Sequence, residues 1–355
     1  MSGYLDSTKP VRPGEELDAP RLESWIRERL PDFTGSLAVE QFPGGHSNLT
    51  YLLRIGEQEM VLRRPPFGNR VKSAHDMGRE YRVLSKLCHV YGPAPRPLAY
   101  CEDESVIGAP FYLMERRRGL VIRNTPPAGV SLDPQNIRRV CEAVVDNLAD
   151  LHGIDYQAAG LGDLGHPEGY ATRQVEGWTK RYFNAKTEEH PEIEQIIPWL
   201  AERIPKGSGA AVVHNDYKFD NLMFDPADLT RIVAVLDWEM CTIGDPLMDL
   251  GCTLAYWPEA GDENVLLPGG FSPTALPGAM TRGEIAARYG EKTGRDVSHL
   301  LFYYCFGLFK LAAVLQQIYW RYANGHTQDK RFAHFNQSVA ILGRAAVQAA
   351  EAGHF

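Results

Sequence analysis

The sequence predicts an α+β fold with two lobes, a small lobe built on an antiparallel sheet and a large lobe that is mostly helical. Short β-type runs separated by turn residues dominate up to about residue 115, whereas long helical periodicities dominate after residue 119. A chain of 355 residues, 44% apolar and 23% charged, is long enough for both lobes. We therefore expect an N-terminal lobe over 1–116 and a C-terminal lobe over 117–355.

The small lobe is expected to begin with a helix and to continue as a sheet. Residues 20–30 have a Pro near their start and apolar residues at helical spacing. Three β-type runs separated by turns then predict a meander: SLAVEQF, NLTYLLRI and EMVLRR. A helix is expected over 74–91, ended by GPAPRP, and two further strands are expected in PLAYCED and PFYLMER.

Helices are expected to fill the large lobe. Asp133 offers an N-cap acceptor and Pro134 is preset for a first turn, so a helix should begin there. One further helical stretch is predicted over about 170–203, and β-type runs return in AAVVHND, NLMF and RIVAVLD. Residues 258–277, rich in Gly and Pro, indicate an irregular insertion.

Composition excludes several classes of partner. A formal charge of −8 gives no electrostatic reason to bind nucleic acid or an anionic membrane. Six scattered cysteines without a CxxC pair fit reduced thiols, and the N-terminus lacks the apolar core of a signal peptide, so a cytoplasmic location is expected. Polar residues in 300–322, Lys310 among them, leave too short an apolar run to span a bilayer, which favours a buried helix. The oligomeric state stays open.

The segment VVHNDYKFDNLMFD, followed by IVAVLDWEM, carries the most specific chemistry. Asp216 and Asn221 lie five positions apart between two β-type runs, and Asp237 ends the next run. Phosphoryl transfer needs one carboxylate to orient the attacking hydroxyl, and a carboxamide and a carboxylate to hold Mg²⁺ at the phosphate oxygens. We assign these roles to Asp216, Asn221 and Asp237 in that order. The alternative is a polar turn whose side chains make only local hydrogen bonds.

With these residues the sequence resembles the aminoglycoside phosphotransferase and choline kinase family, whose HxDxxxxN loop matches His214, Asp216 and Asn221. The resemblance covers about residues 37–321 and implies a bilobal, protein-kinase-like fold with ATP and Mg²⁺ as cofactors. It implies that His214 supports the loop through hydrogen bonding, and that Asp245 and Asp249 of IGDPLMDL form a structural acidic pair.

Nucleotide contacts are expected in the small lobe. The turn PGGHSN could bring backbone N–H groups to phosphate oxygens through Gly45, with donors added by Ser47 and Asn48. A Gly-rich hairpin is also a common plain turn, so this motif alone is unspecific. The resemblance further implies that the backbone at Met114 and Glu115, next to the expected linker, meets the adenine edge.

The resemblance to kinases leads us to expect a phosphate-binding lysine on the third strand, and an arginine replaces it in this sequence. In MVLRR its place is taken by Arg63, and Glu80 on the following helix is the predicted ion-pair partner; Arg64 is the second candidate. Arginine binds phosphate with a planar fork and a different reach, so the phosphate contacts should differ from those of a lysine. An exposed Arg and Glu without this role are the alternative.

One motif is a false match. GLGDLG at 160–165 fits the dinucleotide pattern GxGxxG, but it follows a predicted helix instead of a strand, so we expect an ordinary loop.

The acceptor is predicted to be a small hydroxyl compound. Within the family, GLGDLGHPEGYATRQVEGW, VLRRPPFG and SAHDMGREYRVL resemble the phosphotransferase domain associated with acyl-CoA dehydrogenases, which implies a hydroxyacyl compound instead of an aminoglycoside. A polycationic aminoglycoside would favour carboxylates near Asp216, whereas the large lobe supplies aromatic and basic residues. These are Trp178, Lys180, Arg181, Tyr256, Trp257, Tyr319, Trp320 and Arg321.

Two other functions stay open. A kinase-like regulatory module that holds nucleotide without turnover is suggested by Arg63 and by the missing DFG and APE signatures. A protein-serine kinase is disfavoured because no APE-type segment separates Asp237 from Asp245.

Overall fold

The computed structural model describes residues 7–43, 48–67, 76–123, 129–262 and 273–355. The chain forms two compact units. The first contains Met1–Val121, Ala159–Leu161 and Asn221–Cys241, and the second contains Ile122–Ala158, Gly162–Asp220 and Thr242–Phe355. Residues 221–241 thus associate with the N-terminal part of the chain, although they are distant from it in sequence. The predicted lobe boundary at residue 116 stays a prediction.

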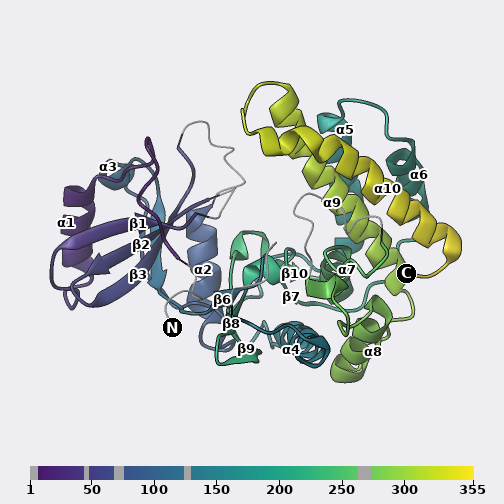
Figure 1. Cartoon of the computed structure of the whole chain (residues 1–355), viewed down its shortest axis with the longest axis horizontal. Helices are drawn as coiled ribbons and strands as arrows, with labels where there is room; N and C mark the ends of the chain where they lie inside the picture. Colours follow the sequence, from purple (N-terminus) through teal and green to yellow (C-terminus); the bar gives the residue numbers. More distant parts are fainter. Residues whose placement is uncertain (1–6, 44–47, 68–75, 124–128, 263–272) are drawn as a thin grey trace. The chain divides into compact units, whose positions relative to one another are not determined.

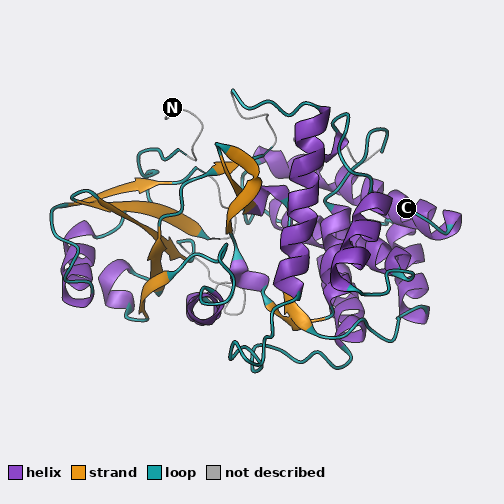
Figure 2. Cartoon of the chain, turned by 90° about the horizontal axis from the view of Figure 1, so that it is seen from below, coloured by secondary structure: helices purple, strands orange, loops and turns teal. Residues whose placement is uncertain are grey.

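The first unit is built on a five-stranded sheet with the strand order β1-β2-β3-β5-β4, drawn in orange in Figure 2. All neighbouring strands are antiparallel, which confirms the predicted meander and the two added strands. The strands are β1 (Leu37–Gln41), β2 (Leu49–Ile55), β3 (Gln58–Arg64), β4 (Pro97–Cys101) and β5 (Phe111–Glu115).

Helices cover this sheet with apolar side chains. α1 (Ala19–Arg29) begins at Asp18, whose carboxylate accepts from the backbone N–H of Arg21, and it packs with α3 (Glu104–Ile107) on a core that contains Met60 and Leu62. α2 (Met77–Leu87) begins in the same way at Asp76. Because successive side chains of a strand point to opposite faces, Arg63 lies on the face opposite to Met60 and Leu62.

A second sheet of the first unit carries part of the predicted site. Its order is β6-β8-β9, with β6 (Leu120–Val121), β8 (Leu222–Asp225) and β9 (Asp228–Val235) all antiparallel. Gly119 allows a close approach here, since a Cβ atom on it would lie 2.4 Å from the Met223 side chain. Leu222 pairs with Val235, so Asn221 and Asp237 flank the same end of the β8–β9 hairpin.

The second unit is mostly helical. Its helices are α4 (Pro134–His152), α5 (Tyr170–Ala185), α6 (Pro191–Glu202), α7 (Pro246–Ala255), α8 (Arg282–Thr293), α9 (Leu300–Ala323) and α10 (Phe335–Ala352). Figure 1 shows α9 and α10 side by side, and the Cys305 thiol on α9 lies 3.6 Å from the carbonyl of Ala346 on α10. A two-stranded sheet pairs β7 (Ala211–Val213) with β10 (Thr242–Gly244).

The predicted start of α4 is confirmed, because the Asp133 carboxylate accepts from the N–H groups of Gln135 and Asn136 at 3.1 and 2.9 Å. The single helical stretch predicted over 170–203 is wrong, since α5 ends at Ala185 and α6 begins at Pro191. Proline lacks the N–H that a continuous helix needs, and it favours a first turn. Three short elements, α3, β6 and β10, were not predicted from the sequence. Of the irregular insertion predicted over 258–277, residues 263–272 lie outside the described residues.

The buried helix predicted over 300–322 is confirmed as α9. The prediction that the apolar run in 300–322 is too short to span a bilayer is wrong, because α9 could cross a membrane by length and composition. However, 72% of its most apolar window is buried inside the structure. That burial is typical of the core helix of a globular unit.

Candidate active site

Asp216 lies on a sharp turn after β7 in the second unit. The residue before it, Asn215, has a φ angle of +67°, in the left-handed region that Asn tolerates better than most residues. The backbone N–H of Asp216 donates to Nδ1 of His214 at 3.2 Å, so the predicted support of the loop by His214 is present. Non-glycine residues in such a conformation often occur at functional sites.

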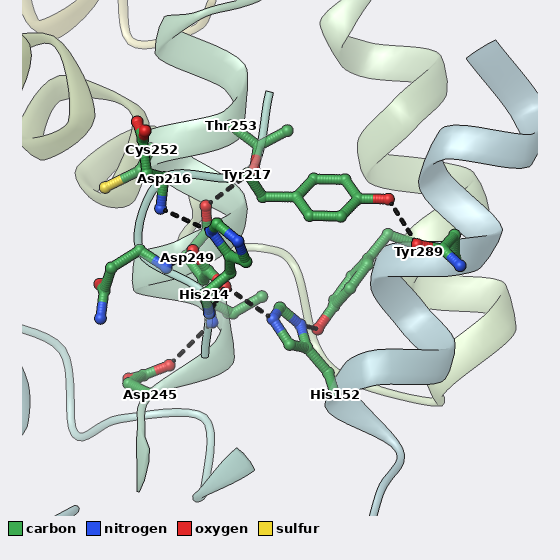
Figure 3. A network of polar contacts seen from close by, with 12 residues as sticks. His152, His214, Asp216, Tyr217, Asp245, Asp249, Cys252, Thr253 and Tyr289 are labelled. Carbon is green, nitrogen blue, oxygen red and sulfur yellow. Dashed lines mark hydrogen bonds and ion pairs between the residues drawn. The ribbon is translucent and has the colours of Figure 1, made fainter. Parts of the chain in front are cut away.

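A buried carboxylate on α7 holds this turn. Asp249 accepts from the N–H of His214 at 2.6 Å and from the N–H of Asn215 at 2.7 Å, and Nε2 of His152 lies 3.2 Å away. Figure 3 shows the His152 ring between Asp249 and Tyr289, whose hydroxyl lies 2.7 Å from Nδ1. Burial would raise the pKa of Asp249, but the contacts with His152 and His214 outweigh burial and lower this pKa.

Asp245, the other member of the predicted acidic pair, also has a structural position. It caps α7 by accepting from the N–H of Leu247 at 2.9 Å. Ser208 N–H and the hydroxyl of Tyr303 donate to it as well, at 3.1 Å each. The structural role that the resemblance implied for this pair is therefore present.

Lys218, which was not predicted from the sequence, and Tyr256, one of the predicted aromatic residues of the large lobe, contact the Asp216 carboxylate. The ammonium of Lys218 lies 2.9 and 3.0 Å from its two oxygens and 4.7 Å above the ring of Tyr256. Burial, then the charge of Asp216 and a hydrogen bond to it, raises the pKa of Tyr256, so the phenol stays a donor at neutral pH. Burial opposes the charge on Lys218, but Tyr256 and Asp216 outweigh it and raise the pKa of Lys218.

The two predicted Mg²⁺ ligands lie in the first unit. Asn221 ends the short 3₁₀ helix η1 (Phe219–Asn221), and its carbonyl accepts from the N–H of Leu236 at 2.8 Å. Asp237 follows Leu236 with a φ angle of +69°. The carboxamide and the carboxylate therefore project from adjacent positions at one hairpin end. Two oxygen ligands fit Mg²⁺, which usually keeps several waters and binds to one or two protein groups plus phosphate.

Arg63 occupies the centre of an ion cluster in the first unit. Its guanidinium lies 3.1 Å from Glu80, contacts Asp237 directly, and lies 3.8 Å from Glu239. The predicted ion pair of Arg63 with Glu80 is thus present, and both side chains are buried. Burial would lower the pKa of Arg63, but Asp237 and Glu80 outweigh it and raise this pKa. One guanidinium faces three carboxylates, so burial and the charge of Asp237 raise the pKa of Glu80 in spite of the pair.

The neighbouring Arg64 is used differently. Its guanidinium donates to the carbonyls of Pro65 and Ile107, both at 3.0 Å, and only 1% of the residue is exposed. Because adjacent strand residues face opposite sides, Arg64 points to α3 and Arg63 to α2. Of the two candidates, Arg63 is therefore the one within reach of Asp237.

Asn48 joins the same cluster. Its amide nitrogen donates to Glu239 at 2.7 Å, and 4% of the residue is exposed. Gly45 and Ser47, predicted beside it as nucleotide contacts, lie outside the described residues. Glu239 was not predicted as a site residue; the available signal was its position two residues after Asp237, inside the 3₁₀ helix η2 (Trp238–Met240).

Met114 and Glu115 end β5. Met114 is 8% exposed, and the backbone N–H of Glu115 donates to the carbonyl of Arg96 at 2.9 Å. The Glu115 carboxylate pairs with Arg117 at 2.7 Å. The adenine contact of both residues stays a prediction.

The GLGDLG segment is a loop between α4 and α5, as expected. Its last glycine has a packing reason, because a Cβ atom on Gly165 would lie 2.2 Å from the hydroxyl of Thr242 and 2.8 Å from the carbonyl of Ile243. Backbone packing, with no need for a dinucleotide, explains that glycine.

The comparisons with known proteins agree with this geometry. The sequence model described as "Phosphotransferase enzyme family" matches residues 38–280. The chain therefore belongs to the phosphotransferase enzyme family, and it is a small-molecule phosphotransferase with a kinase-like fold. Both the fold class and the family resemblance drawn from the sequence are confirmed.

Curated relatives include larger proteins. The chain is 34% identical over 331 residues to acyl-CoA dehydrogenase family member 10 of Mus musculus and 32% identical over 345 residues to family member 11 of Homo sapiens. These matches cover 92% and 94% of this chain, but the chain spans only 30% and 43% of the length of those relatives.

Solved structures give the same fold. A Ralstonia eutropha protein assigned to the aminoglycoside phosphotransferases is 34% identical, with a TM-score of 0.79, and the match covers 95% of this chain and 99% of that one. A choline kinase of Cryptosporidium parvum matches with a TM-score of 0.57 over 93% of this chain and 100% of that one. At 15% identity the choline kinase supports the fold alone.

Proposed function

We propose that this phosphotransferase moves the γ-phosphoryl group of Mg·ATP to a hydroxyl group of a small molecule, with Asp216 as the base. The observation that carries the proposal is the strained, left-handed turn at Asn215. Asp249 holds this turn by accepting from two backbone N–H groups, and the turn presents the carboxylate of the next residue, Asp216. Solved neighbours of the same fold are complexes with ADP or AMP-PNP, which supports nucleotide use.

The proposed reaction balances with these groups. The acceptor oxygen forms a bond to the γ-phosphorus, the bond from that phosphorus to the β,γ-bridging oxygen breaks, and ADP leaves. The hydroxyl proton passes to the Asp216 carboxylate. Lys218 and the phenol of Tyr256 orient that carboxylate by binding it. Mg²⁺, when bound by Asn221 and Asp237, would neutralise charge on the phosphate oxygens.

Arg63 is the proposed phosphate ligand. In this structure its guanidinium binds Glu80 and Asp237. A guanidinium has five N–H donors in a planar fork, so it can keep Glu80 on one edge and offer the other edge to a phosphate. Binding of Mg·ATP would then replace the contact of Arg63 with Asp237 by contacts with the phosphate.

A hydroxyacyl compound is the acceptor class that we propose. Two curated relatives bear the names acyl-CoA dehydrogenase family member 10 and 11, which supports an acyl substrate for the shared domain. The negative charge of Asp216 is already balanced by the Lys218 ammonium, which disfavours a polycationic acceptor. Of the aromatic residues predicted around the acceptor, Trp178 and Trp257 are core residues at 6% and 2% exposure, whereas Tyr256 lies beside Asp216.

The test is a phosphate-transfer screen over hydroxy acids, their CoA esters, choline-like alcohols and aminoglycosides, with wild type and Asp216→Asn. We expect the variant to lose about 100- to 10,000-fold in kcat on the accepted substrate. Asp225→Asn is a matched control, because Asp225 lies at the other end of the β8–β9 hairpin. Equal turnover by wild type and D216N, both folded, would refute the role of Asp216.

The second candidate is a nucleotide-binding regulatory module without turnover. It is favoured by one observation, the contact between Arg63 and Asp237, which engages two proposed nucleotide and metal ligands with each other. A thermal-shift titration with Mg·ATP, run beside the transfer screen, separates the candidates. Stabilisation by the nucleotide with no transfer to any acceptor would favour the module.

A further inference from the structure

Lys310 is a buried charge in the middle of the apolar helix α9. The residue is 6% exposed, and no carboxylate of the described residues forms an ion pair with it. Its ammonium instead donates to the carbonyl of Asn215 at 2.7 Å, lies 3.5 Å from the Cys252 thiol, and lies 5.7 Å from the ring centre of Trp178. Burying an ammonium without a counter-ion is costly, so packing alone does not account for a lysine at this position.

The carbonyl that Lys310 binds belongs to the peptide that joins Asn215 to Asp216. That peptide is planar, so the position of its oxygen fixes the direction in which the chain enters Asp216. Asn215 is held from two other helices as well. Its N–H donates to Asp249 on α7 at 2.7 Å, and its side-chain oxygen accepts from the Tyr170 hydroxyl on α5 at 3.0 Å.

Two glycines bring Lys310 to this carbonyl. A Cβ atom on Gly251 of α7 would lie 2.2 Å from the carbonyl of Tyr303, and one on Gly307 of α9 would lie 2.3 Å from the carbonyl of Gly251. The backbones of α7 and α9 therefore touch, one turn of α9 before Lys310. This close approach places the lysine beside Cys252 and the turn that α7 holds.

We propose that Lys310 is a positioning residue for phosphoryl transfer, which fixes the left-handed turn at Asn215 and thereby directs the Asp216 carboxylate to the acceptor hydroxyl. The proposal rests on the proposed role of Asp216. In the described part of the chain the Lys310 ammonium contacts the Asn215 carbonyl, the Cys252 thiol and the Trp178 ring, so it acts on Asp216 through the backbone. Its removal should lower kcat and leave nucleotide affinity unchanged.

The first experiment compares Lys310→Met with Gln316→Met. Gln316 lies on the same helix, is fully buried, and donates to Ala185 and Thr187 instead of the turn. We expect K310M to lose roughly 10- to 100-fold in kcat, since misplacing a reacting group by about 1 Å costs about that much. The KM for ATP should change less than about twofold. Q316M should lower the Tm but keep kcat within about twofold.

A conservative variant and a double-mutant cycle distinguish a positioning lysine from a merely structural one. For a merely structural lysine, kcat would not follow the pattern expected below. Lys310→Arg keeps a donor for the carbonyl, so it should retain more kcat than K310M. Tyr170→Phe removes only the contact with the Asn215 side chain and should lower kcat by roughly threefold to tenfold. Because both residues act on Asn215, the K310M/Y170F double variant should lose less than the product of the two single losses.

The outcomes distinguish a wrong role for Lys310 from a wrong role for Asp216. A folded K310M with the kcat of wild type, or a loss of kcat that Q316M reproduces, overturns the role of Lys310 while D216N still reports on Asp216. Should K310M not fold, Y170F decides, and an unchanged kcat in Y170F then overturns the proposal. Wild-type turnover by D216N would instead refute the proposed function on which this inference rests.

Discussion

Two fully buried carboxylates, one in each unit, are stabilised in different ways. Asp249 in the second unit binds backbone N–H groups and a histidine, and these contacts lower its pKa. Glu80 in the first unit shares one guanidinium with Asp237 and Glu239, and burial together with Asp237 raises its pKa. The first arrangement fixes one backbone conformation, whereas the second leaves an excess of negative charge that a cation can join.

This difference assigns the two regions different tasks. Backbone hydrogen bonds in a dry site hold a turn in one geometry, which is what a base needs for catalysis. An ion cluster with more carboxylates than cations can exchange partners when Mg²⁺ and phosphate arrive. We therefore expect changes in the second unit to affect kcat, and changes in the first to affect the KM for ATP.

The largest effect is expected for Asp249→Asn. The amide presents only one acceptor to the two N–H groups of His214 and Asn215, so a buried donor is left unpaired. Breaking such a buried contact should cost about 3–5 kcal/mol of unfolding free energy and lower kcat at least about 100-fold. Urea unfolding and steady-state kinetics measure both losses. A folded D249N with normal kcat would show that the turn is held by other contacts.

A smaller effect is expected for Arg63→Lys, with Arg64→Lys as the matched control on the same strand. A lysine ammonium cannot bind Glu80 and a phosphate at the same time in the way a guanidinium does, so the KM for ATP should rise roughly tenfold. R64K should lose stability but keep its KM, because the Arg64 guanidinium donates to the carbonyls of Pro65 and Ile107 and lies over the ring of Phe67. A larger KM effect in R64K than in R63K would reverse our choice between them.

Lys218→Met should have a moderate effect on turnover. The substitution removes the ammonium that binds both oxygens of the Asp216 carboxylate. The carboxylate keeps its hydrogen bond with Tyr256. We expect kcat to fall about tenfold with an unchanged KM for ATP, because the carboxylate loses orientation but keeps its identity. Tyr256→Phe provides the parallel measurement for the phenol. Unchanged kcat in both variants would mean that Asp216 needs no side-chain support.

The smallest effect concerns acid stability. The folded-state pKa of Asp249 lies below its value in the unfolded chain, so its contribution is present above about pH 3.9 and is lost as the pH falls through the folded-state pKa. Wild type should therefore lose unfolding free energy more steeply than D249N below about pH 4. Equilibrium unfolding in buffers from pH 3 to 6 measures the two slopes. Parallel slopes would contradict the lowered pKa.

Most of the fold followed from local patterns. The meander, α1, α2 and the start of α4 were predicted because apolar periodicity, turn residues and N-cap side chains are written in consecutive residues. The break at Pro191 was missed, although proline was visible there. The short α3, β6 and β10 depend on contacts with distant segments, which a pattern of two to four residues does not reveal.

The sequence alone determined the spacing and the side-chain types of Asp216, Asn221 and Asp237, because one loop and one hairpin supply all three residues. Tertiary structure decided what holds them. The choice of Arg63 over Arg64 depends on which face of β3 meets α2, and the support of the Asn215 turn comes from Asp249 and Lys310, 34 and 95 residues away along the chain. Contacts over such separations form only when helices pack, so no local pattern could contain them.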